Sequence, residues 1–143
     1  MLGRKNYTRD QVDHARSAVA ELLAVYKTLV WANARATPNA AVHAELDDVE
    51  RLYFNTMILV LDRYFVHRLR MVTGKDGTPL NDVEMLCDSL MHNEGILRGN
   101  NVITYRPEQA VVKLQIGDPI RLTADTFARL SAAFFAELEE KFL

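Results

Sequence analysis

Three side chains of types that bind metal ions recur at four-residue steps in the second half of the chain. Glu84, Asp88 and His92 fall on one face of a predicted helix, because residues four apart lie one turn above another. Carboxylate and imidazole groups are ligands for divalent cations, so this face is a candidate metal site. Such a site needs further ligands from a second element, and the sequence shows none. A solvated helix surface is therefore the favoured interpretation.

A second candidate site is a basic strip formed by Arg63, His67 and Arg70 near the end of a long predicted helix. Guanidinium groups bind planar anions through two parallel hydrogen bonds, so the strip is suited to a small phosphate or carboxylate ligand. Positive charge is also stabilising at the carboxyl end of a helix. Structural pairing with acidic residues such as Asp47 or Glu137 is therefore the favoured alternative.

The known catalytic motifs are absent from this sequence. It contains no Glu-x-x-His pair, no His-Glu-x-x-His, no Gly-rich phosphate loop and no Gly-x-Ser-x-Gly elbow. The single cysteine, Cys87, lies on the predicted inner face of its helix and is interpreted as a small apolar residue. We therefore expect no catalytic residue and no cofactor, and a non-enzymatic role is favoured.

Composition excludes several classes of function. The 143 residues are 49% hydrophobic and 25% charged, which is typical of a globular domain. A net charge of −2 provides no field to attract nucleic acid. No uncharged apolar segment is long enough to span a membrane, and the amino terminus lacks a secretory signal. With one cysteine, no internal disulfide can form, so we expect a cytoplasmic protein.

The element expected to organise the fold is a helix over residues 39–72. Its apolar side chains cover an arc much wider than the stripe of about 100° that a surface helix needs, so it should contact several neighbours. Asn55 and Asp62 lie beside this arc, where an unpaired polar group costs about 1–3 kcal/mol. We therefore expect both side chains to have hydrogen-bonding partners.

Three further helices are predicted in one domain spanning residues 1–143. The first covers residues 8–34 and begins with a capping box formed by Thr8 and Gln11. The next covers residues 80–93, with Asn81 or Asp82 as its cap, and the last covers residues 123–142, capped by Thr123. The fold class is therefore mainly α, a four-helix bundle-like domain.

A small β-hairpin is predicted between the third and last helices, over residues 101–117. Residues 102–105 are good strand formers, and residues 112–116 alternate between apolar and polar side chains. Residues 106–109 between them have the composition of a turn. An isolated hairpin is marginally stable in water, so this one should pack on the helices.

The segment FVHRLRMVTGKDGTPLNDVEMLCDSLM, residues 65–91, resembles a segment of uncharacterised helical proteins from actinobacteria, and the resemblance extends over most of the chain. No activity is assigned to that family. The resemblance implies a cytoplasmic bacterial protein and identifies no functional residues.

These observations favour a non-enzymatic interaction or scaffold protein that self-associates, most simply as a homodimer. A helix about 50 Å long at 1.5 Å per residue, apolar on two flanks, needs more partners than the other elements provide. The alternative is a protein that binds a small anionic ligand through Arg63, His67 and Arg70.

Overall fold

The computed structural model describes residues 3–143, and this part of the chain is mainly helical, as predicted. Its helices are α1 (Arg9–Ala34), α2 (Ala40–Tyr64), α3 (Arg70–Thr73), α4 (Pro79–His92) and α5 (Ala124–Phe142). None of them is long and apolar enough to cross a membrane. The predicted capping box is present at the start of α1, where Gln11 N donates to Thr8 Oγ1 and Thr8 N donates to Gln11 Oε1. Thr123 likewise caps α5.

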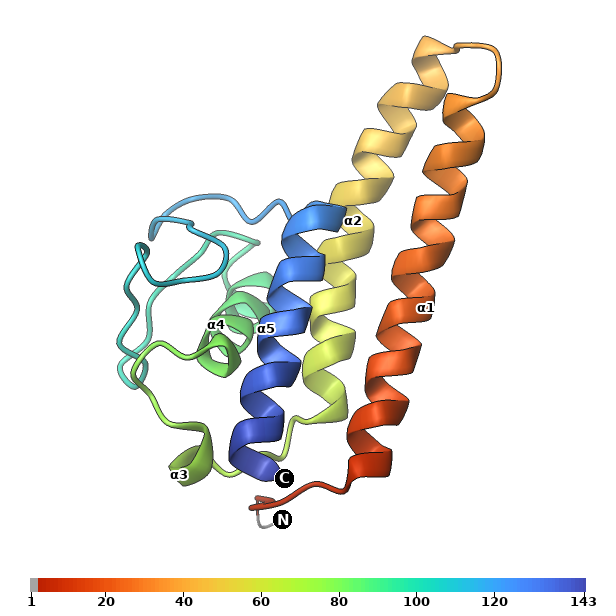
Figure 1. The fold of residues 1–143 in the computed structure, drawn as a ribbon. Helices are drawn as coiled ribbons and strands as arrows, with labels where there is room; N and C mark the ends of the chain where they lie inside the picture. The colour runs from red at the N-terminus through yellow and green to blue at the C-terminus, as the bar shows by residue number, and fades with distance from the viewer. Residues whose placement is uncertain (1–2) are drawn as a thin grey trace.

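The two longest helices form an antiparallel hairpin whose tip projects beyond the rest of the molecule (Figure 1). α5 packs against both α1 and α2, and α4 packs against α2 and α5. The two ends of the described chain meet at the base of this hairpin, where Tyr7 N donates to Phe142 O over 2.9 Å. One side of the hairpin is therefore covered by α4 and α5.

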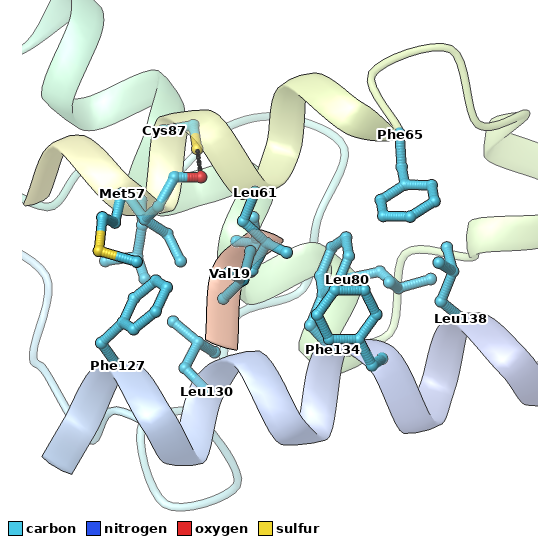
Figure 2. Packing of buried hydrophobic residues seen from close by; sticks show 14 of the residues in the cluster. Val19, Met57, Leu61, Phe65, Leu80, Cys87, Phe127, Leu130, Phe134 and Leu138 are labelled. Atoms are coloured by element: carbon cyan, nitrogen blue, oxygen red, sulfur yellow. Dashed lines mark hydrogen bonds between the residues drawn. The ribbon is translucent and has the colours of Figure 1, made fainter. Parts of the chain in front are cut away.

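The core lies between α1, α2, α4 and α5, and Figure 2 shows part of it, with Val19 of α1 among its residues. α5 alone buries apolar side chains at three- and four-residue steps along its whole length, namely Phe127, Leu130, Phe134, Phe135, Leu138 and Phe142. Fully burying one such side chain stabilises a protein by about 1.5–3 kcal/mol. The inner face of α2 contributes Phe54, Met57, Ile58 and Leu61. Burial of these residues fixes which faces of α1 and α2 remain in solvent.

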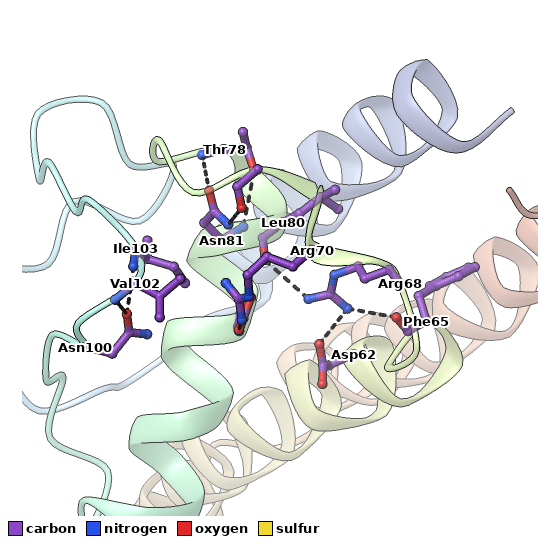
Figure 3. Close-up of polar contacts among 12 residues, drawn as sticks. Asp62, Phe65, Arg68, Arg70, Thr78, Leu80, Asn81, Asn100, Val102 and Ile103 are labelled. Atoms are coloured by element: carbon purple, nitrogen blue, oxygen red, sulfur yellow. Dashed lines mark hydrogen bonds and ion pairs between the residues drawn. The ribbon is translucent and has the colours of Figure 1, made fainter. Parts of the chain in front are cut away.

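The predicted helix over residues 39–72 is wrong beyond Tyr64. α2 has 25 residues and is about 37 Å long, and the chain turns at Phe65. Figure 3 shows the cause: Arg68 Nη1 donates to Asp62 Oδ1 over 2.9 Å and to Phe65 O over 3.0 Å, so its guanidinium closes the turn. Asp62 thus has the partner that was expected, and Asn55 bonds the backbone of Ile120 and Leu122.

The cap predicted for the helix over residues 80–93, which corresponds to α4, is also wrong by a few residues. α4 begins at Pro79, and its cap is Thr78, whose Oγ1 accepts from Asn81 N. Asn81 is the third residue of the helix and its side-chain oxygen accepts from Thr78 N, completing a capping box (Figure 3). Proline is favoured in the first turn of a helix, where its missing N–H removes no hydrogen bond.

The predicted hairpin over residues 101–117 is absent, because no β-strand forms within residues 3–143 and this region is a long loop. Its backbone groups bond to other partners instead. Asn100 Oδ1 accepts from the amides of Val102 and Ile103, and Thr104 N donates to Lys75 O over 2.8 Å. The hydroxyl of Tyr105 donates to Leu114 O over 2.5 Å. These bonds occupy backbone groups on both predicted strands.

Candidate functional site

The structure does not gather the predicted basic strip into one site. Arg63 is exposed on the last turn of α2, and Arg70 lies on α3, where it forms an ion pair with Glu84. His67 lies in the turn between these helices and borders a pocket that neither Arg63 nor Arg70 lines. The helical spacing that placed the three residues on one face ends at Tyr64. Anion binding by this trio stays a prediction, without a shared pocket to support it.

The acidic face of α4 has a structural role at one of its three positions. Glu84 pairs with Arg70 and so ties α4 to α3. Asp88 and His92 are exposed on the same helix. In the described part of the chain, no group of three or more His, Cys, Asp or Glu side chains is placed to hold a metal ion.

The titratable side chains with strongly shifted pKa values lie inside the fold. Burial raises the pKa of the Cys87 thiol, which donates weakly to Ile58 O over 3.5 Å. Burial also raises the pKa of Tyr105 to about 12 and that of Asp82 to about 6. A nucleophilic thiol needs exposure and a lowered pKa, so Cys87 is a core residue.

A pocket of about 280 Å³ lies at the base of the α1–α2 hairpin, and we call it the base pocket. It is formed by the amino-terminal arm, the first turns of α1, the end of α2 and the turn that follows. Its lining residues are Arg4, Tyr7, Gln11, His14, Tyr64, Phe65 and His67. Arg4, His14 and His67 are basic, Tyr7, Tyr64 and Phe65 have aromatic rings, and no lining residue is acidic.

The arm that carries Arg4 is held in place by backbone contacts. Arg4 N donates to His67 O over 2.6 Å, and Leu69 N donates to Arg4 O over 2.8 Å. A Cβ at Gly3 would lie only 3.1 Å from the Cα of Leu69, so glycine permits this close approach. The Tyr7 hydroxyl donates to Phe65 O over 3.3 Å. These contacts join the arm to the turn after α2.

A second feature is an apolar surface on the side of the hairpin away from α5, which we call the hairpin face. It consists of Leu22, Val25 and Leu29 of α1 with Val42, Val49, Leu52, Thr56 and Val60 of α2. Val25, Leu29 and Leu52 are 62%, 51% and 58% exposed. Leu22 borders the same groove as Val49, Leu52 and Val60, and Val25 and Leu29 follow it at three- and four-residue steps. The surface therefore spans both helices.

The groove along this face is nearly continuous on α2. One section, of about 460 Å³, runs beside residues 49–60, and the next, of about 530 Å³, runs beside residues 56–64. The two sections share Thr56 and Val60. Extended apolar patches on a soluble protein mark surfaces that bind a partner.

The fold and these two features define a helical protein with a long α-hairpin, an open apolar face on it and a small basic and aromatic pocket at its base. Neither a protein-family model nor a curated protein nor a solved structure matches this chain. The resemblance to an actinobacterial family therefore stays a prediction.

Proposed function

We propose that this protein is a non-enzymatic interaction protein that self-associates as a homodimer through the hairpin face. The observation that carries this proposal is the open apolar side of the hairpin, on which Val25, Leu29 and Leu52 are each more than half exposed. α4 and α5 already cover the opposite side, and within residues 3–143 no other helix is left to cover this one. Two such faces together would complete a four-helix arrangement.

The size of the face is adequate for a dimer. Two helices, each about 10 Å wide, form a strip about 20 Å across, and the apolar positions extend along it for about 30 Å. The projected area is therefore about 600 Å², and corrugation makes the accessible area larger. Stable interfaces bury about 800 Å² on each partner. The hairpin face is of that order.

Charges at the two ends of the face favour an antiparallel dimer. Glu45 and Arg63 are 18 positions apart, which is about five helical turns, so they lie on one line of α2 about 27 Å apart. A two-fold axis near residue 54 would place Glu45 of each copy beside Arg63 of the other. It would also set Val49 opposite Leu59 and Leu52 opposite Thr56. A parallel dimer would instead bring like charges together.

The experiment is sedimentation velocity over a range of protein concentrations, on the unmodified chain and two variants. We expect a dimer for the unmodified chain. Leu52→Glu would bury a charge at the centre of the interface and should weaken dimerisation by more than tenfold. Met71→Glu is the control, because Met71 is 87% exposed and lies outside the face. A concentration-independent monomer of the unmodified chain would refute self-association.

A charge exchange tests the orientation separately. In an antiparallel dimer, Glu45→Arg places two like charges together and weakens association, and adding Arg63→Glu restores it. In a parallel dimer, residue 45 faces residue 45 of the other copy and residue 63 faces residue 63. Like charges therefore meet at both positions in the unmodified protein, in the single variant and in the double variant, and dimerisation should not change. Equal dimerisation of all three proteins would therefore retain self-association and reject the antiparallel arrangement.

A further inference from the structure

We propose that the base pocket binds a small organic anion, a carboxylate joined to an aromatic or similarly flat apolar body. This function is separate from self-association, and of the residues that line the base pocket only Tyr64 also borders the groove along the hairpin face. The pocket retains His67 from the predicted basic strip but gives it different neighbours, Arg4 and His14. They reach the pocket from the arm, α1 and the turn after α2.

The polar part of the pocket is complementary to a negative charge. It is lined by Arg4, Gln11, His14 and His67, whose side chains carry N–H groups, and no carboxylate of a described residue lines it. Among the described residues, Arg4 has no ion-pair partner. Its guanidinium lies over the Tyr7 ring, with Cζ 5.9 Å from the ring centroid, and can donate to a ligand carboxylate without giving up an internal ion pair.

The remaining lining is aromatic and suits a flat apolar group. Tyr7 and Phe65 are buried and meet edge to face, with their ring centroids 5.0 Å apart, while Tyr64 is partly exposed at the rim. Pockets for drug-sized ligands measure about 300–1,000 Å³, so a pocket of about 280 Å³ suits a smaller molecule. An aromatic acid fits both parts of the lining better than an inorganic anion, which would leave the rings without a contact.

The pocket is largely formed before any ligand arrives. The backbone of Arg4 is bonded to the turn through both its N–H and its carbonyl, and Tyr7 N donates to Phe142 O. A bound ligand would therefore order only the ends of a few side chains. Preorganisation of this kind reduces the entropic cost of binding.

The experiment is an NMR titration of the full chain with benzoate, benzamide and inorganic phosphate as probes. The ring signals of Tyr7, His14, Tyr64 and His67 report on the pocket directly. We expect saturable shifts of these signals with benzoate. Benzamide has nearly the same shape without the charge and should bind at least tenfold more weakly, and phosphate should also bind more weakly than benzoate. Equal binding of benzoate and benzamide would show an apolar pocket without anion recognition and would overturn the proposal.

Two variants separate the pocket from general electrostatic attraction. Arg4→Gln removes the guanidinium that faces the pocket, and Lys5→Gln removes one positive charge from the same arm outside the lining. We expect Arg4→Gln to weaken benzoate binding at least tenfold and Lys5→Gln to change it less than twofold. Equal effects of the two variants, or no saturable shift in the unmodified protein, would refute a built anion site. Unchanged backbone spectra outside the arm verify that both variants fold.

Discussion

Asp82 provides a test of how burial controls the stability of this fold. The residue is 5% exposed in the first turn of α4, and its Oδ2 accepts from Val111 N over 3.2 Å. Burial raises the pKa of Asp82 from 3.8 to about 6, although the hydrogen bond from Val111 acts in the opposite direction. Because the pKa is higher in the folded state, the folded protein binds more protons between pH about 4 and about 6. The free energy of unfolding therefore falls as pH rises through this window.

The magnitude follows from the same pKa values. A rise from 3.8 to about 6 is roughly two pKa units, or about 3 kcal/mol at neutral pH. The amino terminus of α4 favours a negative charge by about 0.3–1 kcal/mol, which leaves about 2 kcal/mol. Asp82→Asn keeps a side-chain oxygen for Val111 N and cannot ionise. We therefore expect this variant to be about 2 kcal/mol more stable than the unmodified protein at pH about 7.5 and equally stable at pH about 4.

The assay is urea unfolding followed by circular dichroism at both pH values, at one fixed protein concentration because association adds to apparent stability. Asp88→Asn is the matched control, since Asp88 lies on the same helix and is exposed. It should change the free energy of unfolding by less than about 0.5 kcal/mol at either pH. A loss of stability in Asp82→Asn that is the same at both pH values would refute the reasoning, because the carboxylate would then carry no ionisation cost.

Two further substitutions test the contacts that shape the end of α2 and the loop before α5. Arg68→Met leaves Asp62 without its partner in a largely buried site and should lower the free energy of unfolding by about 2–3 kcal/mol in urea. Arg51→Met, which breaks an exposed pair, should change it by less than about 1 kcal/mol. Asn55→Ala leaves the carbonyl of Ile120 and the amide of Leu122 without their hydrogen-bonding partner. It should lower the free energy of unfolding by about 2–3 kcal/mol and make the loop before α5 more sensitive to proteolysis. A loss below about 0.5 kcal/mol in Arg68→Met or Asn55→Ala would contradict the corresponding role.

Local sequence signals predicted the starts of α1 and α5, although the equally local capping box of Thr78 and Asn81 at the start of α4 was missed. Thr8 and Gln11 are three positions apart and bond each other's backbone, so the start of α1 follows from a short segment alone. The start of α5 at Thr123 follows in the same way.

Features that depend on contacts between distant segments were not predictable in this way. The apolar pattern continues past Tyr64, and what ends α2 is the pairing of Arg68 with Asp62 and with Phe65 O, together with bonds from the arm to residues 67–69. The predicted hairpin was wrong for a similar reason. Strand propensity at residues 102–105 was overridden when Thr104 N bonded Lys75 O, a group contributed by the turn before α4.

The base pocket has no signature in the sequence. Regular spacing identifies side chains that share one helix, such as Glu84, Asp88 and His92. Arg4, His14 and His67 instead come from an arm, a helix and a turn. Only the antiparallel course of α1 and α2, with the arm folded back across their base, places them around one pocket (Figure 1).

Tyr64 is the point at which the two proposed functions meet. Its ring borders the base pocket and also the end of the groove along the hairpin face, beside Arg63. A substitution at Tyr64 would therefore alter both surfaces, and its effect could not be assigned to either. Leu52 borders only the groove and Arg4 only the pocket. Loss of dimerisation in Leu52→Glu and loss of benzoate binding in Arg4→Gln thus report on separate surfaces, and either proposal can fail while the other stands.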